Sequence, residues 1–119
     1  MDHSILLDKL YDYGFRGSCN DWFRTYLGNR FQCVKILNHY SNKVFMKRGV
    51  PQGSVLGPLL FLLYVNDITK APRFAKLTLF ADDTTGLWCH SDCRALSNMV
   101  STDLLILNQW FEENSLRLN

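Results

Sequence analysis

An α+β fold is the prediction for this chain of 119 residues, because helical and strand-like segments are mixed without a strict alternation of strand and helix. Four segments carry apolar side chains at helical spacing, and two pairs of strand-like segments are each joined by a short turn. Hydrophobic residues make up 47% of the sequence, which is ordinary for a globular chain and argues against disorder. The length corresponds to one domain or part of one.

Two helices are expected in the first 30 residues. Ser4 is placed to cap the first helix, and Gly14 to end it. The second helix is predicted over residues 21–27, with Ser18 or Asn20 as its cap. The aromatic residues of this helix are expected to belong to the core.

A basic hairpin is predicted next. Residues 31–37 and 43–50 have side chains that suit two strands, and the polar residues 38–42 between them suit a turn. The hairpin leads directly into a segment rich in glycine and proline.

The second half begins with a helix predicted over residues 57–65, where Pro58 occupies the first turn. This helix is apolar on every side, so it is expected to be buried. Pro72 marks a loop, and residues 76–81 and 84–88 are predicted to form a second hairpin.

A long helix is predicted over residues 92–114. Its apolar residues recur at the i, i+3, i+4 spacing of one helix face. Asp103 is the one charged residue on that face and is an exception to the pattern.

Two adjacent carboxylates, Asp82 and Asp83, occupy the expected turn of the second hairpin. On a regular strand they would point to opposite faces, whereas a tight turn can present both to one cation. Two carboxylates about 4 Å apart repel by roughly 4 kcal/mol at an effective dielectric of 20, so a bound cation would stabilise the pair. Mg²⁺ prefers such oxygen ligands. The alternative is a solvent-exposed turn, where aspartate is common without any ligand.

Residues 49–58 form the other candidate binding element. Gly49 and Gly53 allow the backbone to approach a ligand closely, and Pro51 stiffens the turn. Gln52 has an amide that both donates and accepts hydrogen bonds. The N-terminus of the following helix favours anions. The alternative is a turn that does no more than start that helix.

These two elements resemble motifs of the reverse transcriptase domain of non-LTR (LINE-like) retrotransposons. Residues 49–61 are similar to motif B, and residues 80–83, Phe-Ala-Asp-Asp, are similar to motif C. The resemblance extends over the whole chain. Group II intron-type reverse transcriptases share the Ala-Asp-Asp box, but the wording of residues 53–61 favours the retrotransposon branch.

The resemblance implies an RNA-directed DNA polymerase that transfers nucleotides with two metal ions, Mg²⁺ or Mn²⁺. Its partners would be an RNA template, a DNA primer and deoxynucleoside triphosphates, and its location would be intracellular, in the nucleus. The implied catalytic and metal-binding residues are Asp82 and Asp83. The implied substrate-binding residues are Gly49, Pro51, Gln52, Gly53 and Phe80. Ordinary strand packing is the alternative for Phe80.

The resemblance also predicts one partial domain over residues 1–119, made of palm and fingers hairpins packed with helices. Motif A, with a further metal-binding aspartate, would lie just before Met1, and motif D just after Asn119. We therefore expect the isolated chain to bind Mg²⁺ weakly and not to polymerise. An exposed sheet edge would then invite self-association.

Charge is unevenly distributed. Residues 13–66 contain seven basic side chains and one acidic side chain, a net charge of +6, whereas residues 82–119 have a net charge of −4. A basic first half suits a phosphate backbone, although a solvated surface explains it equally well. The alternative function is therefore a decayed or domesticated non-catalytic module that binds nucleic acid or protein.

Other chemistry is not supported. The four cysteines are expected to be reduced, and the Cys89 to Cys93 segment has too few ligands for a structural zinc site. His3 and His39 have no evident partner. No apolar run is long enough to span a membrane, so no membrane partner is expected.

Overall fold

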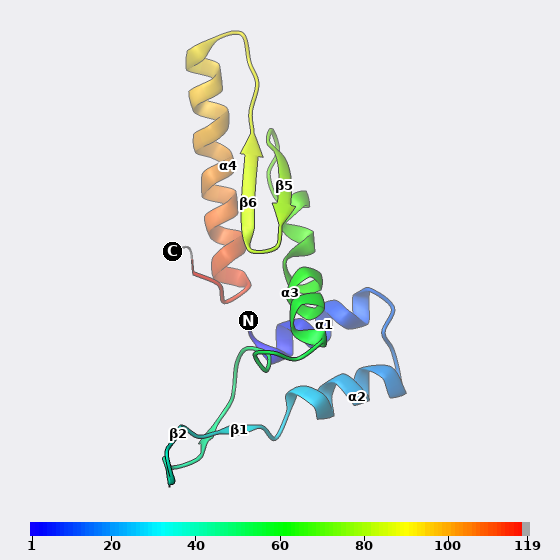
Figure 1. Cartoon of the computed structure of the whole chain (residues 1–119). Helices are drawn as coiled ribbons and strands as arrows, with labels where there is room; N and C mark the ends of the chain where they lie inside the picture. Colours follow the sequence, from blue (N-terminus) through cyan, green and yellow to red (C-terminus); the bar gives the residue numbers. More distant parts are fainter. Residues whose placement is uncertain (118–119) are drawn as a thin grey trace. The chain divides into compact units, whose positions relative to one another are not determined.

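The structure is a computed structural model that describes residues 1–117, and it confirms the α+β class. Figure 1 shows helices together with two-stranded antiparallel hairpins. The chain divides into two compact units, Met1–Gly57 and Pro58–Asn119. Among the described residues, no helix combines the length and the apolar character needed to cross a bilayer.

Two packed helices form the core of the first unit. Helix α1 covers His3–Asp12 and helix α2 covers Ser18–Leu27. Leu6 and Leu10 are fully buried, and Leu27 has only 1% of its surface exposed. These leucines lie where the two helices pack together. These helices lie where the apolar spacing predicted them.

The predicted cap of α1 was wrong. Asp2 is the N-cap, and its carboxylate accepts hydrogen bonds from the backbone N and the hydroxyl of Ser4 at 3.0 and 2.6 Å. The Ser4 hydroxyl hydrogen bond is the main cause that holds the pKa of Asp2 below its ordinary value. A carboxylate also suits the positive end of a helix better than a hydroxyl does.

The predicted cap of α2 was wrong as well. Gly17 precedes the helix with a φ of 57°, and no side chain caps it. Asn20 is instead buried, and its amide donates to the carbonyls of Leu7 (3.1 Å) and Phe15 (3.2 Å). Sequence patterns cannot distinguish these uses, because capping and buried bridging both require a short polar side chain. Trp22, expected in the core, is 52% exposed.

The basic hairpin exists, but its strands are shorter than predicted. Strand β1 (Phe31–Gln32) pairs with β4 (Val44–Phe45), and β2 (Lys35–Ile36) pairs with β3 (His39–Tyr40). The reversal therefore lies at residues 37–38, and β3 occupies part of the predicted turn.

A side chain interrupts the ladder between these two pairs. The hydroxyl of Ser41 accepts from the Val34 N–H at 2.9 Å, in addition to the backbone bond from Ser41 N to the Val34 carbonyl. All four short strands are exposed. A two-stranded ribbon of this kind has little packing to keep it regular. We call residues 30–48 the basic arm (Figure 1).

The second unit is a hairpin packed with helices. Helix α3 (Leu56–Val65) begins at the end of the first unit and continues into a 3₁₀ helix, η1 (Asn66–Lys70). The hairpin consists of β5 (Lys76–Phe80) and β6 (Asp83–Leu87), and α4 (Cys93–Glu113) follows it.

The expected burial of α3 on every side was wrong. Leu60 and Tyr64 are fully buried, whereas Leu59 and Leu62 are 52% and 43% exposed. Only one side of the helix is therefore covered by the described residues. Composition alone cannot reveal this, because every side of α3 is equally apolar.

A hydrogen bond connects the C-terminal end of α4 to α3. The hydroxyl of the buried Tyr64 donates to the carbonyl of Asn114 at 2.6 Å, and Asn114 itself is 7% exposed. Ile68, Leu107 and Trp110 complete the apolar core of this unit.

Candidate functional site

The acidic turn differs in detail from the prediction. Phe80 pairs with Asp83, so Ala81 and Asp82 alone form the two-residue loop between β5 and β6. Ala81 has a φ of 52°, a conformation that costs energy for a residue other than glycine. Asp83, predicted in the turn, is instead the first residue of β6.

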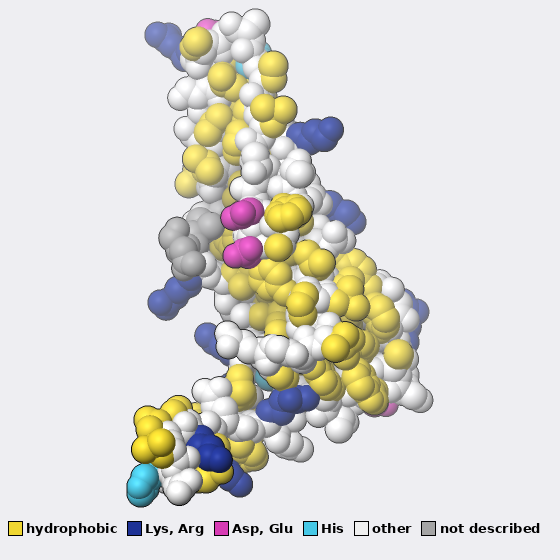
Figure 2. Space-filling model, viewed as in Figure 1, with side chains coloured by type: hydrophobic (Ala, Val, Ile, Leu, Met, Phe, Trp, Pro, Cys, Tyr) yellow, Lys and Arg dark blue, Asp and Glu magenta, His cyan; other side chains and the backbone are white. Residues whose placement is uncertain are grey.

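This register determines how Asp83 is presented. Cross-strand partners point to the same face of a hairpin, so Asp83 and Phe80 share one face. Phe80 is 81% exposed, which excludes ordinary strand packing for it among the described residues. Asp82 and Asp83 are exposed too, and acidic side chains lie together at this turn in Figure 2.

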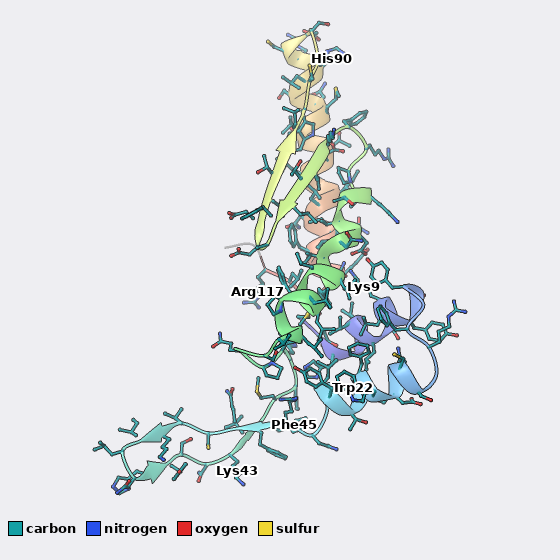
Figure 3. The ribbon with its side chains drawn as sticks, turned by 45° about the vertical axis from the view of Figure 1, so that its right-hand side comes forward. Lys9, Trp22, Lys43, Phe45, His90 and Arg117 are labelled. Atoms are coloured by element: carbon teal, nitrogen blue, oxygen red, sulfur yellow. The ribbon has the colours of Figure 1, made fainter. Side chains whose placement is uncertain are left out.

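Asp82 and Asp83 line one open pocket of about 600 Å³. Its apolar lining comes from α3, η1 and α4 and their flanks: Phe61, Val65, Ile68, Phe111 and Leu116. Arg117 is the one cationic side chain among the lining residues, and Figure 3 shows it near the end of α4. The pocket therefore brings two carboxylates and a guanidinium together with apolar side chains of the helices.

The donor set at the turn suits a hydrated divalent cation. Mg²⁺ usually binds to one or two carboxylates and keeps several of its water molecules. Asp82 and Asp83 supply that number, and both are open to solvent. Among residues 1–117 no group of three or more His, Cys, Asp or Glu side chains is placed to enclose a metal ion. Two carboxylates leave most coordination positions of such a cation to water or to other oxygen ligands.

The far end of the same hairpin is held by Asp103, which is fully buried. Its Oδ1 accepts from the Arg73 N–H at 2.8 Å, and its Oδ2 accepts from the Phe74 and Ala75 N–H groups at 3.0 and 2.7 Å. The indole Nε1 of Trp88 also donates to Oδ2, at 2.9 Å. In the sequence, Asp103 is an exception on an apolar helix face, and that exception is the signal of its structural role.

The pKa of Asp103 reflects this environment. Burial by itself raises the pKa, but the four hydrogen bonds, from Arg73 and Trp88 first and then from Phe74 and Ala75, outweigh burial. The pKa therefore lies below its ordinary value, and the carboxylate is ionised at neutral pH.

The glycine-rich segment of the first unit forms a hydrogen-bonded turn. The N–H of Ser54 donates to the Pro51 carbonyl at 3.2 Å, which leaves Gln52 and Gly53 at the two central positions. Gly53 has a φ of 78°, as the second central position of a type II turn requires. Gln52 is exposed on this turn.

The start of α3 closes against this turn. The Gly57 N–H donates to the Ser54 hydroxyl at 3.1 Å, and a Cβ at Gly57 would lie 3.0 Å from that oxygen. Gly49 also has a positive φ, 83°, and a Cβ added at Gly49 or Gly53 would meet no described atom within 4 Å. Gly49 and Gly53 therefore allow the backbone conformation of the turn and leave open space beside it.

Gly49 is also anchored to the beginning of the chain. Its N–H donates to the Met1 carbonyl at 2.8 Å, and His3 Nε2 donates to the Gly49 carbonyl at 2.7 Å. Arg48 pairs with Asp2 at 3.7 Å. The expectation that His3 has no partner was wrong. The sequence gives no signal for this contact, because its two residues are 46 positions apart.

The structure thus brings Asp82, Asp83 and Phe80 together at one hairpin end and Pro51, Gln52 and Gly53 together at one turn. That the two groups meet in one site stays a prediction.

The Cys89 to Cys93 segment is remote from the acidic turn. Figure 3 shows His90 at the end of the β5–β6 hairpin opposite to Arg117. Cys19, Cys33, Cys89 and Cys93 are all free and exposed.

Comparison with known proteins gives a consistent result. All 119 residues match the family described as reverse transcriptase (RNA-dependent DNA polymerase). A "Probable RNA-directed DNA polymerase from transposon BS" of Drosophila melanogaster is 34% identical over 103 residues, which cover 81% of this chain and 11% of that protein. No solved structure matches significantly.

Two further relatives come from mobile elements. The "RNA-directed DNA polymerase from mobile element jockey" of Drosophila melanogaster is 29% identical, over 81% of this chain and 11% of its own length. A Pol polyprotein from "type-1 retrotransposable element R2" of Popillia japonica is 22% identical over 90% of this chain and 16% of its own length. The chain thus spans only about a tenth to a sixth of these relatives. It belongs to the reverse transcriptase (RNA-dependent DNA polymerase) family and is homologous to the polymerases of non-LTR retrotransposons.

Proposed function

We propose that this chain contributes metal-binding carboxylates to an RNA-directed DNA polymerase that transfers nucleotides to a primer. The observation that carries the proposal is the pair Asp82 and Asp83, which is exposed at the closed end of the β5–β6 hairpin and lines one open pocket. Among the described residues, these two carboxylates have no ion-pair role that stabilises the fold.

Asp82 and Asp83 would hold Mg²⁺ or Mn²⁺, which neutralises a triphosphate and activates a primer hydroxyl when bound. Asp82 is ranked first, because it occupies the turn itself and Asp83 is held within the strand ladder. Phe80, exposed beside Asp83, offers an apolar ring to a base or sugar.

The glycine-rich turn would contact the nucleotide and the template. Gln52 presents an amide that pairs with either donors or acceptors, and open space lies beside Gly49 and Gly53. Pro51 supplies the carbonyl that fixes the turn. The expected partners are an RNA template, a DNA primer and deoxynucleoside triphosphates, and the expected site of action is the nucleus.

Metal binding tests the proposal directly. We expect the purified chain to bind Mn²⁺ with a dissociation constant on the order of 1 mM, since two exposed carboxylates form an open, partly hydrated site. Asp82→Asn should weaken this binding several-fold, as measured by the electron paramagnetic resonance signal of free Mn²⁺. Asp8→Asn, a change of the same kind on an exposed face of α1, is the matched control. Equal affinity in the Asp82 variant and in this control would contradict the proposal.

A second candidate function rests on the basic arm. Between Asp21 and Asp67 the sequence contains no acidic residue, and the arm itself carries five basic ones: Arg30, Lys35, Lys43, Lys47 and Arg48. Exposed aromatic rings accompany them, with Phe31 and Phe45 paired edge to face at 5.4 Å. Figure 3 shows Phe45 on β4 and Lys43 just before this strand. Positive charge with exposed rings suits single-stranded nucleic acid.

Replacing Lys43 and Lys47 with glutamine should therefore weaken RNA binding and reduce its dependence on salt. For a single strand, the slope of log K against log salt should become shallower by about 0.7 for every phosphate that the arm no longer neutralises. Fluorescence anisotropy with a labelled single-stranded RNA at several salt concentrations measures this slope. Lys9→Gln and Lys70→Gln, two lysines outside the arm, form the control pair. An unchanged slope in the arm variant would remove the candidate.

Self-association is a further expected property. The β5–β6 sheet has two strands, and neither outer edge pairs with another strand among the described residues. Exposed edges of this kind favour pairing with a second chain. Light scattering should show dimers or larger species at micromolar concentration, and a sharp monomer peak would count against this expectation.

A further inference from the structure

The four hydrogen bonds of Asp103 come from two segments, one on each side of the β5–β6 hairpin in the sequence. Arg73, Phe74 and Ala75 precede β5 directly, and Trp88 follows β6 directly. One carboxylate on α4 therefore binds the segment that enters β5 and the segment that leaves β6, at the open end of the hairpin and opposite to the acidic turn. All of these contacts lie within the second unit.

The Trp88 contact has its own support in β6. A Cβ built on Gly86 would lie 2.5 Å from Cη2 and 2.6 Å from Cζ3 of the Trp88 indole. The indole thus lies directly over the backbone of Gly86, and its Nε1 is directed to Asp103 Oδ2. Any side chain at residue 86 would displace the indole and lengthen that hydrogen bond.

Helix α4 also contributes to the pocket. Phe111 lies eight residues after Asp103 on the same helix and lines the pocket together with Asp82 and Asp83. Because a helix is rigid over two turns, the Asp103 contacts fix the hairpin relative to this pocket wall.

The length of the hairpin makes this anchoring consequential. Five residues per strand place the acidic turn about 17 Å from the anchored end. A rotation of about 5° at the anchor would move Asp82 and Asp83 by about 1.5 Å at that rise per residue. Displacements of about 1 Å at a reacting group can change rates about 100-fold.

We propose that Asp103 is a positioning residue for the metal-binding turn: its carboxylate holds the two strands of the β5–β6 hairpin against α4 at their open end and thereby sets where Asp82 and Asp83 lie at the pocket. This inference rests on the proposed function, because it assigns a role toward the same carboxylate pair. Asp103 itself touches neither metal nor substrate in this role.

The test uses the ¹⁵N-labelled chain and the broadening of its amide signals by Mn²⁺. In the natural sequence we expect residues 81–84 to broaden first. In Asp103→Asn, at a temperature where its amide spectrum remains dispersed, the same broadening should require about ten times more Mn²⁺. A purely structural role would lower the unfolding midpoint and leave the Mn²⁺ response of the folded form unchanged.

Trp88→Phe provides the second variant. It removes one of the four hydrogen bonds and keeps the three backbone bonds, so it should fold even where Asp103→Asn does not. Its Mn²⁺ requirement should rise about threefold, and Gly86→Ala should produce a similar rise by displacing the indole.

The outcomes are distinguishable. An unchanged Mn²⁺ response in folded Asp103→Asn, or in Trp88→Phe if the first variant is unfolded, would overturn the positioning role and leave the metal site standing. Absence of broadening at residues 81–84 in the natural sequence would instead overturn the proposed function, and the positioning role with it.

Discussion

Replacing Asp103 with asparagine should lower the free energy of unfolding of the second unit by about 3 kcal/mol. The carboxylate accepts four hydrogen bonds, and an asparagine amide turns one of its two oxygens into a donor that faces another donor. Hydrogen bonds to a charged group contribute about 1.5–3 kcal/mol each, but the losses are not additive. Urea denaturation followed by circular dichroism measures the difference.

Asp92→Asn is the matched control on the same helix. Asp92 is the N-cap of α4 and accepts from the N–H groups of Arg94 and Ala95. Asparagine caps a helix about as well as aspartate, so this variant should lose only a few tenths of a kcal/mol. If Asp103→Asn is no more destabilised than Asp92→Asn, the four hydrogen bonds do not stabilise the unit.

The stabilisation by Asp103 should depend on pH with a definite sign. Because its folded pKa is depressed, the folded state binds the proton less readily than the unfolded state, whose pKa is the ordinary one of an aspartate. The contribution is therefore fully present above the unfolded pKa and is lost as pH falls through the folded pKa. The difference in unfolding free energy between the natural sequence and Asp103→Asn should be constant from pH 7 to about pH 5 and should shrink below about pH 4.

Replacing Asp82 with asparagine should have the largest effect on catalysis. In a longer protein that joins this segment to the remaining polymerase domain, we expect primer extension to fall at least about 100-fold, because the variant loses a ligand to a metal that stabilises transition-state charge by several kcal/mol. Incorporation of a labelled nucleotide on an RNA template measures the rate. Salt-sensitive RNA binding should remain, since the basic arm is untouched.

Two further variants make this result specific. Asp83→Asn should also reduce extension, and Asp8→Asn, on the surface of α1, should not. Phe80→Ala should raise the KM for nucleotide more than it lowers kcat if the exposed ring contacts a base or sugar. Activity of Asp82→Asn within a factor of two of the natural sequence would show that the acidic turn does not bind the catalytic metal.

Local patterns predicted the secondary structure well. The apolar spacing placed α1, α2, α3 and α4 within a few residues of their observed ends. The basic hairpin was found, although its ladder is interrupted at Ser41 by a side-chain hydrogen bond that no propensity encodes. Capping was predicted less well, because Asp2 and Ser4 are both good caps and only their geometry decides between them.

Within the candidate site, the local placement of the motif residues follows from their sequence, whereas their roles in binding stay predictions. Asp82 and Asp83 lie at the hairpin end, and Gln52 and Gly53 lie in the turn, as their local sequence requires. His3 was missed because its partner, the Gly49 carbonyl, is 46 residues away and is a backbone atom. Backbone carbonyls are identical at every position, so their long-range partners leave no trace in residue type.

The motifs alone identified the family, because a motif depends on residue types at fixed positions along the chain. The binding roles of the site residues stay predictions. The register, which puts Ala81 and Asp82 in the turn and Asp83 beside Phe80, was known only from the folded structure. It also showed that Asp103, which is only an exception on an apolar helix face in the sequence, binds the segments that flank β5 and β6 at the open end of the hairpin. Register and hydrogen-bond partners depend on distances in space and not on positions along the chain. Residues 73 and 88 come close to the same carboxylate only when β5 has paired with β6.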